Sequence, residues 1–169
     1  MLTRKVLERI LGQQVSKATG AAIQHGIDNE ANARTAYEFA RNVSVKEVGL
    51  FKHNRIARTH ASPDGVLADA NIGVELKAPT PATHFETLMS GEIPEKYRVQ
   101  CLWQIAVCGF EAVDYVSYDP RFNPSAQLFI KRVDRDAAAI ADLEARVEQF
   151  LAEVDAKEAE FRNRFAEAA

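Results

Sequence analysis

The sequence has few of the features that mark membrane, secreted or disulfide-bonded proteins. Among its 169 residues, no apolar run approaches the roughly 18 residues that a membrane span needs. The only two cysteines, Cys101 and Cys108, lie about two turns apart on one face of a predicted helix, too far apart to form a disulfide. Neither has the CxxC partner of a zinc site. Because the N-terminus is charged and periodic and does not resemble a signal peptide, we expect a cytoplasmic protein without membrane association.

A strong positive charge is also missing, and the formal net charge of −3 argues mildly against binding to nucleic acid. The charge is unevenly distributed, however. Residues 134–169 contain ten acidic and five basic residues, a net charge of −5, which leaves +2 for residues 1–133. Within that slightly basic part, one short segment gathers Lys52, His53, Arg55, Arg58 and His60. Such a cluster predicts either contacts with phosphates or a solvated strand edge, and the sequence leaves both interpretations open.

Apolar periodicity predicts helices and strands in an order typical of an α/β protein. The predicted helices cover residues 3–11, 21–40, 84–89, 95–108 and 140–165. The predicted strands cover residues 43–51, 56–60, 65–67, 73–77, 112–117 and 127–133. Since the sequence shows no internal repeat and no linker, we expect a single domain over residues 1–169. In this domain, helices would flank a mixed β-sheet and the last helix would be long.

Two neighbouring predicted strands carry charged residues that are suited to phosphodiester hydrolysis. This reaction needs an activated water and stabilisation of negative charge, and divalent cations supply both. The carboxylates of Asp64 and Glu75, on the two strands of one hairpin, can share a hard cation such as Mg²⁺. Glu75 and Lys77 leave the same face of their strand, so the ammonium of Lys77 would lie beside the reacting water or phosphate. A Pro-Asp-Gly turn or a Glu-x-Lys pair alone is common, but the combination on adjoining strands is much more specific.

Five motifs follow one another in order along most of the chain. They are Gly26-x-x-x-Glu30, Ser62-Pro63-Asp64-Gly65, Glu75-Leu76-Lys77 followed by Pro79, Tyr97-x-x-Gln100, and Tyr118-Asp119-Pro120-Arg121. The spacing of Pro63-Asp64 and Glu75-x-Lys77 resembles the motif of the PD-(D/E)xK nucleases. The complete series resembles the phage lambda-type recombination exonucleases within that superfamily.

The resemblance implies a restriction-endonuclease-like core and assigns roles to individual residues. The metal ligands that it implies are Asp64, Glu75, Glu30 and the backbone carbonyl of Leu76. Lys77 would position the attacking water, and Gln100 would anchor the site from the helix behind it. The implied cofactor is Mg²⁺, with Mn²⁺ as a substitute. For contacts with DNA we name Lys52, Arg55, Arg58 and Arg121.

The resemblance also implies an activity and partners. Members of this family digest one strand of linear duplex DNA from its 5′ end, work as ring-shaped trimers and pair with a single-strand annealing protein. A protein of this kind would come from a phage or prophage and act in the cytoplasm of a bacterial host. Longer members carry an additional N-terminal segment with an arginine that helps to hold the 5′ phosphate, to which this sequence has no counterpart.

Several alternatives stay open at this point. The same scaffold could support an endonuclease, or a DNA-end binding protein with an inactive centre, although an inactive centre has no physical reason to keep buried charges. Arg121 either contacts a phosphate or binds the loop at Asp119. Gln104, one turn after Gln100, either joins the site or packs in the core, and we favour packing. We interpret Trp103 as a core residue and His84 as a surface residue.

Overall fold

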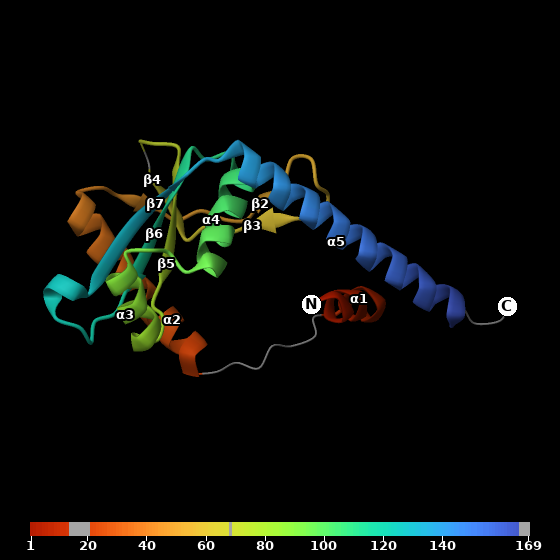
Figure 1. Cartoon of the computed structure of the whole chain (residues 1–169), viewed down its shortest axis with the longest axis horizontal. Helices are drawn as coiled ribbons and strands as arrows, with labels where there is room; N and C mark the ends of the chain where they lie inside the picture. Colours follow the sequence, from red (N-terminus) through yellow and green to blue (C-terminus); the bar gives the residue numbers. More distant parts are fainter. Residues whose placement is uncertain (14–20, 68, 166–169) are drawn as a thin grey trace. The chain divides into compact units, whose positions relative to one another are not determined.

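The computed structural model describes residues 1–13, 21–67 and 69–165, with only the backbone of residues 21–28. These residues belong to two compact units (Figure 1). One unit comprises residues 1–18 and 141–169, and the other comprises residues 19–140. The larger unit contains every strand of the described chain and all of the motif residues.

A five-stranded mixed sheet forms the centre of the larger unit. Its strand order is β1-β4-β5-β6-β7, with β5 and β6 parallel and every other neighbouring pair antiparallel. The strands are β1 (Val45–Lys46), β4 (Gly65–Leu67), β5 (Ile72–Lys77), β6 (Ala112–Tyr118) and β7 (Leu128–Asp134). The parallel pair requires a crossover connection, which the helices α3 (Pro81–Ser90) and α4 (Glu95–Cys108) supply. The mixed sheet with flanking helices confirms the fold class predicted from the sequence.

Helices cover both faces of this sheet because side chains alternate along β5 and β6. Helix α2 (Ala21–Arg41) packs on the face that carries the apolar side chains of the strands. The buried members of that core cluster are Ala33, Tyr37, Val45, Val74, Leu76 and Val116. Glu75 and Ser117 leave the opposite face and make hydrogen bonds with side chains of α4 and α3, respectively. The polar residues of β5 therefore lie under α4, while its apolar residues lie under α2.

A charged group is also buried on the α2 face. The carboxylate of Asp114 in β6 accepts hydrogen bonds from the Tyr37 hydroxyl, at 2.7 Å, and from Nε of Arg132, also at 2.7 Å. Burial raises the pKa of Asp114, but these two hydrogen bonds outweigh it, so the pKa lies below its usual range. The same burial, together with the hydrogen bond to Asp114, raises the pKa of Tyr37. The group ties α2 to β6 and β7 as an ionised pair.

The smaller unit consists of α1 (Leu2–Leu11) and the greater part of α5 (Ala137–Arg164). Val6 and Val154 are its buried apolar residues. Arg9 bridges the two helices through ion pairs with Asp155, at 2.5 Å, and Glu158, at 3.5 Å. No helix in the described part of the chain is long and apolar enough to span a membrane.

The predicted helices and strands agree with the structure except around residues 43–60 and at the start of α3. The predicted strand 43–51 is divided into β1 and β2 (Phe51–Lys52), because β1 pairs with β4 whereas β2 pairs with β3 (His60–Ala61). Residues 56–59, predicted as part of a strand, lie in the turn between β2 and β3. Helix α3 begins earlier than predicted, because Thr80 caps it and Pro81 is well tolerated in a first turn. The predicted stop of α4 at Gly109 is confirmed by its left-handed φ of 74°.

Candidate active site

Asp64 is held at the start of β4 by its hydrogen bonds to the next strand. Its backbone N–H donates to the carbonyl of Val74 at 3.1 Å. Its carboxylate oxygen Oδ2 accepts from the backbone N–H of Leu76 at 2.7 Å. The short β4–β5 hairpin therefore fixes both the backbone and the side chain of Asp64 beside β5.

Glu75 lies in the middle of β5 with only 1% of its surface exposed. Three donors converge on its carboxylate. Gln100 donates from Nε2 to Oε1 at 2.6 Å, Gln104 donates to Oε2, and the ammonium of Lys77 contacts Oε1. A buried carboxylate needs such partners to remain charged. Helix α4 thus orients both oxygens of Glu75 through two amides one turn apart.

Lys77 lies two residues after Glu75 on the same face of β5, as predicted from the strand period. Its Nζ contacts Glu75 and lies 4.0 Å from Oδ2 of Asp64. Burial lowers the pKa of Lys77, but the charges of Glu75 and Asp64 outweigh it, so the pKa is raised and the ammonium stays charged. The ring of Tyr97 lies 5.7 Å from the same Nζ and stacks on Tyr115 at 5.5 Å. Tyr97 and Gln100 of one motif therefore border the site from the same helix.

The two carboxylates oppose one another electrostatically. Burial and the charge of Glu75 raise the pKa of Asp64 to about 6, and the nearby Lys77 offsets only part of this rise. Two buried carboxylates close together repel one another, and a bound cation would offset this repulsion with its positive charge. The carboxylate pair therefore fits the divalent metal that the sequence predicts.

The available donors are those that Mg²⁺ prefers, namely oxygens. The N–H of Leu76 points toward Asp64, and the N–H and C=O of one strand residue face the same neighbouring strand. The Leu76 carbonyl therefore lies on the Asp64 side of β5, where the predicted ligand role requires it. No group of three His, Cys, Asp or Glu side chains gathers as a metal site in the described part of the chain. The protein would thus offer two carboxylates and a carbonyl, which leaves positions for water and substrate, as is usual for Mg²⁺.

Glu30 approaches this region from α2 on the other side of the sheet. Arg34, one turn later, donates to Oε1 of Glu30 at 3.3 Å and to the backbone carbonyl of Asp64 at 3.4 Å, and it also contacts Glu47. Glu30 is therefore linked to Asp64 through Arg34. Its role as a metal ligand stays a prediction.

Gln104 is the residue whose sequence-based interpretation needs correction within the site. We favoured packing, but its amide donates to the buried carboxylate of Glu75. The sequence already pointed to this contact, because residues four apart on a helix share a face and Gln100 was assigned to the site. Arg34 was missed as a site residue, although the same spacing places it on the helix face of Glu30.

The structure also shows the contacts of three other residues whose roles were predicted from the sequence. His84 is buried and not at the surface, because Ser117 Oγ at 2.7 Å and the Ala126 carbonyl at 2.9 Å satisfy both ring nitrogens. Trp103 is only partly buried and donates from Nε1 to the carbonyl of His60 at 3.0 Å. Arg121 binds the Asp119 carboxylate through two nitrogens, at 2.7 and 2.8 Å, which is the second of its two predicted roles. Contact of Arg121 with a phosphate stays a prediction.

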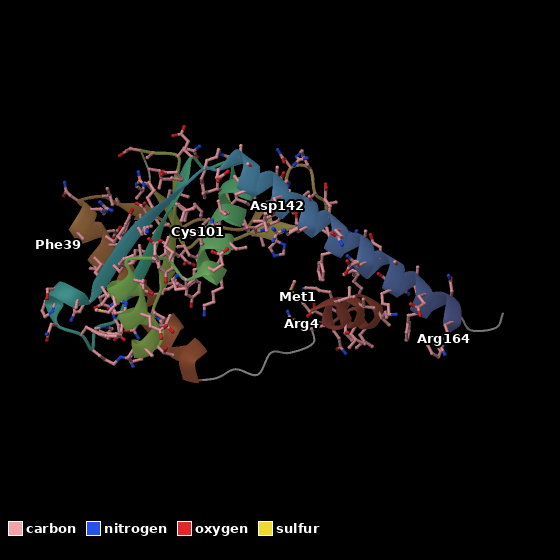
Figure 2. All side chains as sticks on the ribbon, in the orientation of Figure 1. Met1, Arg4, Phe39, Cys101, Asp142 and Arg164 are labelled. Carbon is pink, nitrogen blue, oxygen red and sulfur yellow. The ribbon has the colours of Figure 1, made fainter. Side chains whose placement is uncertain are left out.

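The cysteines behave as expected. Both Cys101 and Cys108 are free thiols. Cys101 lies on α4, where the helix meets the strands (Figure 2). Burial, with a smaller effect of Glu75, raises the pKa of its thiol to about 12, so it stays protonated and inert.

Comparison with solved structures identifies relatives along nearly the whole chain. An alkaline exonuclease, LHK-Exo, from Laribacter hongkongensis is 36% identical, with a TM-score of 0.92 over 99% of this chain and 84% of that one. The structure of LHK-Exo in complex with dAMP matches with a TM-score of 0.93 over 99% of this chain and 85% of that one, again at 36% identity. A phage related exonuclease from Haemophilus somnus 129PT, 12% identical, has a TM-score of 0.74 over 95% of this chain and 82% of that one, and shows the fold alone.

The sequence was also compared with curated proteins and with models of protein families. Comparison with curated protein sequences gave no match. Residues 1–111 match the model of the YqaJ-like viral recombinase domain, which includes both carboxylates, Lys77 and the two glutamines of α4. Together with the 36% identity to an exonuclease over nearly the full length, this match shows that the chain belongs to the YqaJ-like viral recombinase family.

Proposed function

We propose that this chain is a nuclease that hydrolyses one strand of linear duplex DNA from its 5′ end, with Mg²⁺ as cofactor and Mn²⁺ as a substitute. Residues 1–169 would work as a single nuclease domain. The observation that carries the proposal is the meeting of Asp64, Glu75 and Lys77 on one hairpin, with Lys77 Nζ in contact with one carboxylate and 4.0 Å from the other. The nucleotide in the structure of LHK-Exo with dAMP supports a nucleic-acid substrate.

The roles of the residues follow from their chemistry. Asp64, Glu75 and the Leu76 carbonyl would hold the cation, and Glu30 would support it from α2. When bound, the cation supplies Lewis acidity and makes water a stronger nucleophile near neutral pH. Lys77, which stays charged, orients the attacking water or stabilises the negative charge that develops on the phosphate. Gln100 and Gln104 fix the direction of the Glu75 carboxylate through their hydrogen bonds.

Digestion of linear duplex DNA labelled at either the 5′ or the 3′ end tests this proposal. We expect loss of the 5′ label first, only with Mg²⁺ or Mn²⁺, and no cutting of closed circular duplex DNA. Cutting of the circle would favour an endonuclease on the same fold. Binding of ends without hydrolysis in either metal would favour an inactive end-binding protein.

We also propose that the chain works as a homo-oligomer, a trimer according to the resemblance, with a single-strand annealing protein as partner in the cytoplasm of a bacterial host. The charge of residues 1–133 supports this, because a net charge of only +2 attracts a duplex weakly at physiological salt. A ring would gather several such surfaces around one duplex and focus their potential. Light scattering tests the assembly, and an active, processive monomer at micromolar concentration would contradict it.

A further inference from the structure

A small hairpin rich in basic side chains leads directly into the candidate active site. It is formed by β2 and β3, and we call residues 51–61 the basic hairpin. Lys52, Arg55, Arg58 and His60 are exposed on it, and the segment contains no acidic residue. Lys52, Arg58 and His60, together with His53, also line a cavity of about 300 Å³. Lys52 and Arg58 place two positive charges at the wall of this cavity, which favours an anion over a neutral ligand.

The basic hairpin is held in place by hydrogen bonds and by a ring contact with α4. The buried ring of His53 accepts hydrogen bonds at Nδ1 from the backbone N–H of Arg55, at 3.1 Å, and of Ile56, at 3.2 Å. Trp103 of α4 donates to the His60 carbonyl, and its ring lies 5.4 Å from that of His53. The same helix carries the glutamines that orient Glu75. Helix α4 therefore fixes the basic hairpin and the catalytic carboxylate relative to one another.

Arg58 adopts an unusual backbone conformation, with φ at +65°. A long side chain rarely occupies this left-handed region, where glycine and asparagine are better tolerated. Backbone strain of this kind clusters at active sites and ligand-binding segments. In this hairpin it presents an arginine next to the cavity.

We propose that the basic hairpin binds the sugar–phosphate backbone of duplex DNA beside the phosphate that is cleaved. His60 precedes Asp64 by four residues, so their Cα atoms are at most about 14 Å apart. The charges of one DNA strand follow one another every 3.4 Å or so along the axis, which places His60, at the end of the hairpin nearest Asp64, within about four phosphates of the active centre. The inference rests on the proposed nuclease function for its substrate, and it assigns the contacts that compensate for the low net charge of the chain.

The test uses the whole chain and measures DNA binding in EDTA, so that hydrolysis does not enter. The variants are Lys52→Gln, Arg58→Asn and both together, since asparagine suits the left-handed φ while removing the charge. A matched control, Arg146→Gln, removes an exposed positive charge on α5. Arg58→Lys keeps the charge at the hairpin. Fluorescence anisotropy with a blunt-ended duplex, repeated at several salt concentrations, gives the Kd and its salt dependence.

Each lost phosphate contact should lower the slope of log K against log salt by about 0.9, which corresponds to about eightfold in Kd at 0.1 M salt. The double variant should therefore bind roughly 60-fold more weakly than the parent, with Arg58→Lys close to the parent. A double variant that binds like Arg146→Gln, with an unchanged salt slope, would overturn the proposal. Equal losses for Arg58→Lys and Arg58→Asn would also overturn it for Arg58, because the effect would then be structural and not electrostatic. Digestion by the parent chain in Mg²⁺ tests the nuclease function separately, so failure of either inference can be recognised.

Discussion

Replacing Glu75 by glutamine removes one negative charge from the site while preserving the volume of the side chain. Three donors, the amides of Gln100 and Gln104 and the ammonium of Lys77, now converge on its two oxygens. Glutamine keeps one oxygen, so its NH₂ group must face one of these donors. A buried polar group without an acceptor costs about 1–3 kcal/mol. Part of this cost is offset, because Asp64 no longer faces a neighbouring negative charge.

From these opposing effects we expect the free energy of unfolding of metal-free Glu75→Gln to fall by about 2 kcal/mol, a decrease in Tm of roughly 4–8 °C for a chain of this size. The affinity for Mg²⁺ should fall far more. A hard cation requires a charged oxygen ligand, and changing a residue that merely supports a ligand already costs 10–100-fold or so. We therefore expect a loss of more than about 100-fold in affinity, with nuclease activity lost in parallel.

Three measurements on one preparation check this prediction: thermal unfolding without metal, calorimetric titration with Mg²⁺, and digestion of end-labelled linear duplex DNA. Glu86→Gln provides a matched control, because Glu86 is exposed on α3. Magnesium-dependent cleavage by Glu75→Gln at a near-normal rate would show that Glu75 is not a metal ligand. A variant that fails to fold would instead show that the charge of Glu75 contributes much more than about 2 kcal/mol to the free energy of unfolding.

Lys77→Ala should lower the rate of hydrolysis by about 10²–10³ and weaken metal binding far less, and calorimetry showing a loss as large as in Glu75→Gln would contradict the separate roles. Gln104→Leu removes a donor to Glu75 but also an oxygen that is buried without a partner in the described part of the chain, so stability should change by less than about 1 kcal/mol while affinity for Mg²⁺ falls 10–100-fold or so. Asp114→Asn should cost about 2 kcal/mol in urea unfolding at neutral pH, less than a fully buried pair because the side chain of Arg132 is 43% exposed. Since the pKa of Asp114 is lowered by folding, the wild type loses this stability as the pH falls below about 4, and the two proteins should then unfold alike, whereas a constant difference at every pH would refute the assignment.

Much of the candidate site follows from local sequence. Asp64 and Glu75 are joined by a short hairpin, and Glu75 and Lys77 are two apart on one strand, so the chain itself brings them together whatever surrounds them. The same reasoning predicted most of the helices and strands, because apolar periods of 3.6 and 2 are properties of single segments. The stop of α4 at Gly109 belongs to this class as well.

Contacts between distant segments decided the rest. Gln104 reaches Glu75 across 29 positions, and His84 is buried because Ser117 and Ala126, 33 and 42 positions away, satisfy its two nitrogens. The division of residues 43–51 between two strands depends on which partners β1 and β2 find. The local sequence around a polar side chain is the same whether that side chain faces water or a buried partner. The partner supplies the free energy that favours burial, and it lies elsewhere in the chain. The sequence therefore predicted that Asp64, Glu75 and Lys77 meet and that Gln100 anchors them, because these residues lie in short motifs. Only the tertiary structure showed that Gln104 and Arg34 also bind Glu75 and Asp64, because those contacts join distant segments.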